Sequence, residues 1–178
     1  MIKQENSIFW FRRDLRLSDN HGLYQSLTQS GTVLPIFIFD PNILETLADK
    51  ADKRVNFIYQ TLKAIQEQLT ETGSSLYVLH ATPLEAFEQL TKAYDIKAVY
   101  TNHDYEPYAI ARDTEVSEFL KTKHIAFHSF KDQVIFEKDD IVKSDSTPYT
   151  IFTPFSKVWK AKYNEGKKVR YPSEKHLD

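Results

Sequence analysis

The chain has 178 residues, of which 41% are hydrophobic and 27% are charged, and its formal net charge is −2. This size and composition fit a single globular domain, and the absence of cysteine excludes disulfides and thiolate metal sites. No apolar run is as long as a membrane span, and residues 1–7 do not resemble a signal peptide, so we expect a cytoplasmic protein without a membrane partner.

The first expected element is a strand over 8–11, an apolar and aromatic run long enough to be buried on both faces. The run stops at a charged loop over 12–16. Residues that favour helix N-caps follow at 18–20, which predicts a helix over about 21–30. In an open α/β sheet, ligands bind where such central strands end.

Strands and helices then alternate along the chain. Further strands are expected over 33–39, 76–80, 98–101 and 125–130, and helices over 55–69, 83–94 and 108–122. This alternation predicts an α/β fold, a Rossmann-like doubly wound sheet of five parallel strands with helices on both faces. The strand order 3-2-1-4-5 is expected, with strands 1 and 4 side by side at the switch point.

The alternation ends after the fifth strand. Residues 133–137 are predicted to form a short extra strand. Thr153 is predicted to cap a last helix, with Pro154 at its first position and its end near Tyr163.

Charge is unevenly distributed along the chain. Between residues 157 and 175, seven Lys or Arg stand against two Glu, a net charge of +5 that leaves −7 for the rest. Because the acidic part repels the DNA backbone, we expect any DNA binding by this chain to be weak, salt-dependent and confined to the tail. We expect an α/β domain over 1–163 and a basic linker over 164–178.

Charged side chains follow strands 1, 2 and 4 where these strands end. Arg12 and Arg13 follow the first strand, Asp40 the second, and Asp104 and Glu106 the fourth. Arginine there can meet a phosphate or carboxylate, and the carboxylates can accept hydrogen bonds from a ring N–H or a sugar hydroxyl. Two structural alternatives stay open: the charges of the first loop pair with one another and brace it, and Glu106 caps the following helix.

Several chemical motifs are absent from the sequence. There is no glycine-rich phosphate loop, no nucleophile elbow and no metal-ligand spacing among the six histidines, so no catalytic or metal site is predicted. Arg112 and Asp113 are expected on the inner face of their helix, as a buried brace against the first loop without a ligand role.

The segment FWFRRDLRLSDN, residues 9–20, resembles the N-terminal signature of the DNA photolyase/cryptochrome family. Three further segments agree in order, at 40–41, 101–113 and 147–160. The resemblance covers essentially the whole chain but only the front part of the family, without the helical flavin-binding part that follows.

This resemblance implies the light-harvesting antenna domain of a deoxyribodipyrimidine photolyase, a carbon–carbon lyase that uses light to repair cyclobutane pyrimidine dimers in DNA. In the family, an antenna chromophore in this domain passes excitation to FAD in a C-terminal helical domain. The implied partners are damaged DNA and that helical domain, within a monomeric full-length protein, and the 178-residue chain alone is expected to be inactive. The alternatives are a cryptochrome-type blue-light photoreceptor without repair activity and a stand-alone nucleotide-binding α/β protein.

The pattern over 101–113 is most similar to family members whose antenna is a deazaflavin. The resemblance assigns five residues to the chromophore pocket: Arg12, Asp40, Arg54, Asp104 and Glu106. Folate-binding members carry an Asn–Glu pair where this chain has Tyr108 and Ala109, which disfavours folate. A deazaflavin is therefore expected first, with FMN, FAD, folate or no chromophore as the alternatives.

Overall fold

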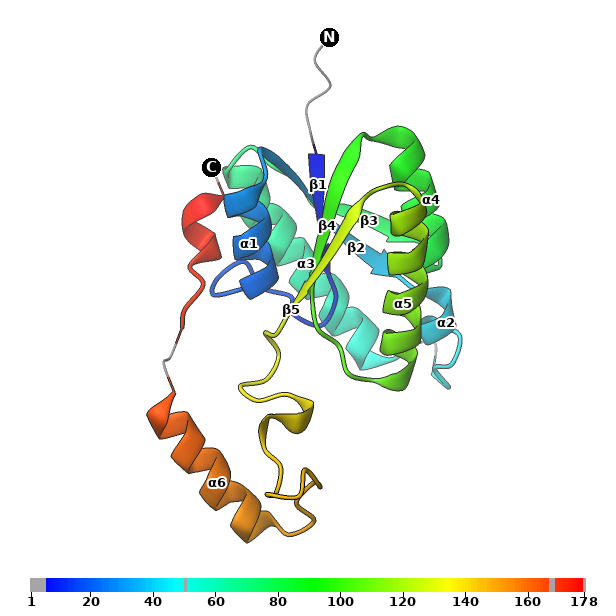
Figure 1. The fold of residues 1–178 in the computed structure, drawn as a ribbon. Coiled ribbons are helices and arrows are strands. Elements are labelled where there is room, and N and C mark those ends of the chain that lie inside the picture. Colours follow the sequence, from blue (N-terminus) through cyan, green and yellow to red (C-terminus); the bar gives the residue numbers. More distant parts are fainter. Residues whose placement is uncertain (1–5, 50, 167–168, 178) are drawn as a thin grey trace. The chain divides into compact units, whose positions relative to one another are not determined.

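The structure is a computed structural model that describes residues 6–49, 51–166 and 169–177 (Figure 1). It divides into two compact units, one formed by residues before Val134 together with those after Arg170, the other by 134–170. No helix among the described residues is both long and apolar enough to cross a membrane.

The first unit contains a sheet of five parallel strands in the order β3-β2-β1-β4-β5, which confirms the predicted topology. The strands are β1 (Asn6–Phe11), β2 (Thr32–Phe39), β3 (Tyr77–His80), β4 (Ile96–Asn102) and β5 (Ala126–Phe130). The helices of this unit are α1 (His21–Gln29), α2 (Pro41–Leu44), α3 (Lys53–Glu71), α4 (Pro83–Ala93) and α5 (Pro107–Thr122), with a 3-10 turn η2 (Ser173–His176).

Helices cover both faces of the sheet, as predicted (Figure 1). Alternate residues of β1 point to opposite faces, so this one strand supplies both cores. Ile8 and Trp10 pack with α4 and α5, whereas Phe9 and Phe11 pack with α1 and α3. All four side chains are at most 2% exposed, which makes β1 the central strand of the fold.

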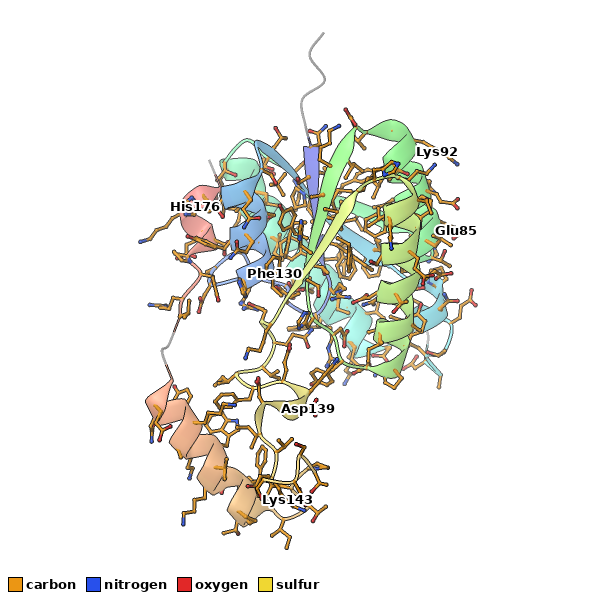
Figure 2. All side chains as sticks on the ribbon, in the orientation of Figure 1. Glu85, Lys92, Phe130, Asp139, Lys143 and His176 are labelled. Carbon is orange, nitrogen blue, oxygen red and sulfur yellow. The ribbon has the colours of Figure 1, made fainter. Side chains whose placement is uncertain are left out.

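The helix ends follow local capping chemistry. Asn20 caps α1, because its side chain accepts a hydrogen bond from the Leu23 backbone at 3.1 Å. Thr82 and Glu85 form a capping box at the start of α4. Glu85 in the first turn and Lys92 in the last, both labelled in Figure 2, also complement the helix dipole.

The short helix α2 was not expected from the sequence. Asp40 caps it by accepting a hydrogen bond from the Asn42 backbone at 3.0 Å, and Pro41 takes its first position. A single turn of four residues carries no readable periodicity, so only the Asp–Pro pair signalled it.

Two predictions for the segment after β5 are wrong. Residues 133–137 form no strand, since the structure pairs no neighbouring strand with them among the described residues. The helix α6 (Phe152–Glu165) begins before Thr153, and its N-cap residue Ile151 makes no side-chain cap. Pro154 therefore lies at the third helical position, which a helix tolerates because backbone N–H groups in the first turn have no intrahelical partner.

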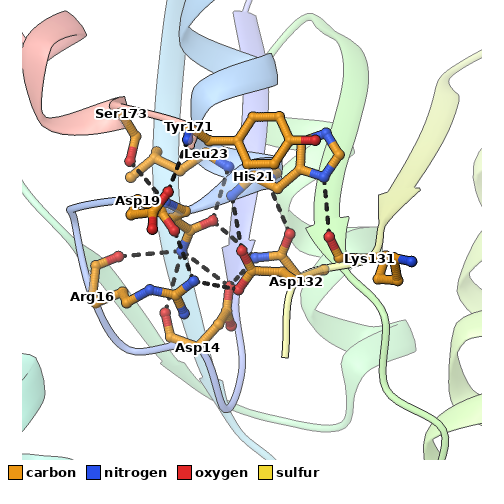
Figure 3. Close-up of polar contacts among 12 residues, drawn as sticks. Asp14, Arg16, Asp19, His21, Leu23, Lys131, Asp132, Tyr171 and Ser173 are labelled. Atoms are coloured by element: carbon orange, nitrogen blue, oxygen red, sulfur yellow. Dashed lines mark hydrogen bonds and ion pairs between the residues drawn. The ribbon is translucent and has the colours of Figure 1, made fainter. Parts of the chain in front are cut away.

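The segment after the second unit packs on α1 (Figure 3). The hydroxyl of Ser173 donates to the Leu17 carbonyl at 2.6 Å and accepts from the Asn20 backbone at 3.1 Å. The ring of Tyr171 stacks on His21 with centroids 3.6 Å apart. The linker expected over 164–178 stays a prediction, and its Lys167 and Lys168 lie outside the described residues.

Candidate functional site

A cavity of about 340 Å³ lies at the carboxyl ends of β1, β2 and β4. Its apolar wall comprises Trp10, Phe11, Phe37, Ile38, Phe39, Ile43, Leu44, Leu47, Val55, Ile58, Pro83 and Ala109. Its polar lining comprises Arg12, Arg13, Asp40, Arg54, Asp104, Glu106, Tyr108 and Arg112. The structure thus brings all five residues assigned from the sequence around one cavity. Four of them follow strands whose carboxyl ends meet at one edge of the sheet, and Arg54 comes from the start of α3.

Arg12 is held by protein partners at the base of the cavity. Its Nη1 donates to both carboxylate oxygens of Asp113, at 2.5 and 2.6 Å, and its Nη2 donates to the Asn102 carbonyl. Burial lowers the pKa of Arg12 from its usual value, and the nearby Asp113 opposes that effect. Its Nε is buried without a hydrogen-bond partner among the described residues. Arg12 therefore braces the loop after β1 against α5.

The sequence-based alternative for the first loop is wrong in its partners. It paired the charges of the loop with one another, whereas the arginines reach carboxylates of other segments. Arg13 contacts Glu106 at 2.6 Å, and Arg16 contacts Asp132 at 2.7 Å (Figure 3). The loop is braced, but by residues about 90 or more positions away along the chain.

Arg112 lines the cavity, a role that the sequence analysis did not give it. Its Nε and Nη2 donate to Asp113 at 3.0 and 2.9 Å, so the predicted brace between this pair and the first loop is confirmed. The guanidinium groups of Arg112 and Arg12 both lie over the ring of Trp10, at 4.9 and 5.1 Å from its centroid. Helical spacing in the sequence could have indicated this role. Arg112 follows Ala109, another lining residue, by three positions, so both lie on one face of α5.

Asp40 and Tyr108 are joined directly. The Tyr108 hydroxyl donates a short hydrogen bond to Oδ2 of Asp40, while Oδ1 of Asp40 caps α2. Burial raises the pKa of Tyr108, and its hydrogen bond to Asp40 raises it further. Tyr108 therefore remains a protonated donor at neutral pH.

Asp104 and Glu106 differ in their surroundings. The Asp104 side chain is 6% exposed. Its Oδ1 accepts a hydrogen bond from the Glu106 backbone N–H at 3.3 Å and lies 3.9 Å from Nη1 of Arg13. Glu106 is 61% exposed and pairs with Arg13. It occupies the N-cap position of α5 but makes no side-chain capping hydrogen bond, so the alternative of a capping side chain is wrong.

Arg54 lies at the exposed rim of the cavity. It pairs with Asp52 at 2.6 Å, and its own side chain is 76% exposed. Asp52 caps α3, and its hydrogen bonds from Arg54 lower its pKa to about 2. Among the lining arginines, Arg54 is thus the most accessible to a ligand in solution.

Residues 7–173 match the family model described as DNA photolyase. The chain belongs to the DNA photolyase family. It is 39% identical over 154 residues to a deoxyribodipyrimidine photo-lyase of Synechococcus sp., covering 86% of this chain and 32% of that relative. The chain spans about a third of the length of the curated photolyases that it matches.

Solved structures of a photolyase and of a cryptochrome share the fold of this chain. The archaeal photolyase of Sulfolobus tokodaii, described with two FAD molecules and a novel light-harvesting cofactor, has a TM-score of 0.71 and 29% identity, covering 93% of this chain and 35% of that one. The Synechocystis cryptochrome has a TM-score of 0.82 at 21% identity, covering 97% and 37%, a likeness of fold alone.

Proposed function

We propose that this chain is the light-harvesting domain of a DNA photolyase and that its cavity holds the antenna chromophore. The observation that carries the proposal is the position and lining of the cavity. It lies at the switch point of a doubly wound sheet and combines an apolar wall with a charged rim. About 340 Å³ falls within the range of small-molecule sites and suits a planar ring system.

In this proposal, Arg12, Asp40, Arg54, Asp104 and Glu106 form the chromophore site with different roles. The buried carboxylate of Asp104 accepts hydrogen bonds from the ring, and the exposed Arg54 meets an anionic end of the ligand. Arg12 supports the site from below, since both of its terminal nitrogens already have protein partners.

A deazaflavin is the chromophore that the pattern over 101–113 favours, with FMN, FAD and folate as the other candidates. FAD gains support from the Sulfolobus tokodaii relative, whose description names two FAD molecules and a light-harvesting cofactor. Flavins and deazaflavins share a planar ring with an imide edge, which suits a cavity with both carboxylates and guanidinium groups in its lining.

For the full-length protein we propose light-driven repair of pyrimidine dimers, with FAD in a C-terminal helical domain and damaged DNA as the substrate. The 178-residue chain alone is proposed to lack this activity. A repair assay under light with full-length protein distinguishes an enzyme from a cryptochrome-type photoreceptor.

Fluorescence titration tests the chromophore site. Trp10 lines the cavity and the other tryptophan is Trp159, so a Trp159→Phe background leaves one reporter at the site. Titration with deazaflavin, FMN, FAD and folate should quench Trp10 with at least one of them. Asp104→Ala should weaken that binding by about tenfold, the loss of one hydrogen bond to a charged group, whereas Asp95→Ala at an exposed pair should not. The proposal is wrong if none of the four ligands quenches Trp10.

A further inference from the structure

Tyr108 connects two elements that flank the cavity. Its hydroxyl donates to Asp40 and accepts a hydrogen bond from Nδ2 of Asn42 at 3.3 Å. Asp40 and Asn42 lie at the start of α2, and Tyr108 lies in the first turn of α5. One phenol therefore ties together two walls of the site, across 68 positions of the sequence.

Asp40 is occupied on both oxygens by this arrangement. Oδ1 is used to cap α2, and Oδ2 is the oxygen that Tyr108 takes. The carboxylate is buried and lines the cavity, so a ligand N–H that reaches Oδ2 must share this oxygen with the Tyr108 hydroxyl or displace the hydroxyl from it. The hydrogen bond that Oδ1 accepts is not available for exchange with a ligand, because it satisfies a backbone N–H at the start of α2.

Tyr108 lies at the exposed rim of the cavity. The residue is 41% exposed, so much of it faces solvent and it is not held in the hydrophobic core. The groups that face its hydroxyl are Asp40, Asn42 and the charge of Arg112. Of its two hydrogen-bond partners, Asp40 lines the cavity and Asn42 does not, so a ligand in the cavity can reach Asp40.

The geometry points to Tyr108 as the gate and specificity residue of the cavity: its hydroxyl competes with a ligand N–H for Asp40. This inference rests on the proposed function. Tyr108 selects ligands with an imide or lactam N–H, because such a group can take the place of the phenol on Asp40. Ligands that present only acceptors at this edge are excluded. Removing the hydroxyl removes the competitor, so the affinity for an imide ligand rises by about tenfold, as expected for one charge-assisted hydrogen bond.

A matched pair of ligands tests the gate. FMN carries an imide N–H at N3, and N3-methyl-FMN lacks it. The 178-residue chain is compared with Tyr108→Phe and with the control Tyr105→Phe, which alters an exposed tyrosine outside the lining. We expect Tyr108→Phe to bind FMN about tenfold more tightly and N3-methyl-FMN unchanged, with no effect of Tyr105→Phe. Equal FMN affinity of Tyr108→Phe and wild type overturns the gate.

A ligand-free measurement separates the gate from the proposed function. The amides of Ile43 and Leu44 both donate to the Asp40 carbonyl at 3.0 Å, so their hydrogen exchange reports the stability of α2. Exchange should accelerate by about tenfold in Tyr108→Phe and stay unchanged in Tyr105→Phe. If wild type binds no flavin but amide exchange is faster in Tyr108→Phe, the flavin-type site is wrong and the stabilisation of α2 by the Tyr108–Asp40 hydrogen bond is confirmed. Unchanged exchange in Tyr108→Phe overturns that stabilisation.

Discussion

Replacing Asp113 by Asn tests the brace beneath the cavity. Asp113 contacts two buried guanidinium groups, Arg12 at 2.5 and 2.6 Å and Arg112 at 2.9 and 3.0 Å. No other carboxylate among the described residues forms an ion pair with either one. The substitution keeps the shape of the side chain but leaves two buried positive charges beside each other, and the charge of Arg112 already disfavours the charged form of Arg12.

The expected loss can be worked from this geometry. Removing one partner of a buried ion pair costs about 3–5 kcal/mol. The Asp113 side chain is 18% exposed and Asn still accepts one hydrogen bond, so the lower part of the range applies, about 3 kcal/mol. For a chain of this size, that corresponds to a fall in Tm of about 6–12 °C.

Urea denaturation measures the free energy of unfolding directly. The control is Asp95→Asn, which breaks the exposed pair with Lys97 and should cost less than about 1 kcal/mol. Replacing both partners, as Arg12→Met with Asp113→Leu, should recover part of the loss, because no charge of that pair is then buried alone. A loss for Asp113→Asn no larger than that of the control would refute the reasoning.

Three other outcomes follow from local geometry. A Cβ on Gly22 would lie 2.8 Å from Oδ1 of Asn102, so Gly22→Ala should lower Tm by an amount equivalent to about 1–3 kcal/mol, while Gly31→Ala, with no atom within 4 Å, should not. Asn20→Ala removes a cap and leaves buried polar groups unpaired, and urea denaturation should show a loss of about 2–4 kcal/mol. Because the folded pKa of Tyr108 is raised above its usual value of 10, its stabilisation is complete below pH 10 and is lost as pH rises through the folded pKa. The urea midpoint of wild type should therefore fall more steeply above pH 10 than that of Tyr108→Phe.

The sequence by itself determined the five strands and the four longer helices of the first unit, α1, α3, α4 and α5, and their order. The apolar run of β1, the helical periodicity of α3 and the Thr82–Pro83 start of α4 are local signals, and each element formed where these signals predicted it, within a few residues. The alternation of strands and helices allows few topologies, so the strand order also followed. Four of the five predicted site residues met at one cavity for the same reason: they follow strands whose carboxyl ends share an edge, whereas Arg54 comes from the start of α3.

Only the tertiary structure decided the partner of each charge. Arg12 lies next to Arg13 in sequence, yet one pairs with Asp113 inside the protein and the other with Glu106 at its surface. The Tyr108–Asp40 hydrogen bond likewise joins residues far apart in the chain. Periodicity and capping act over a few residues, whereas an ion pair depends on burial and on which side chain of another element lies within about 3 Å. Sequence spacing therefore located the site, and packing set the role of each side chain in it.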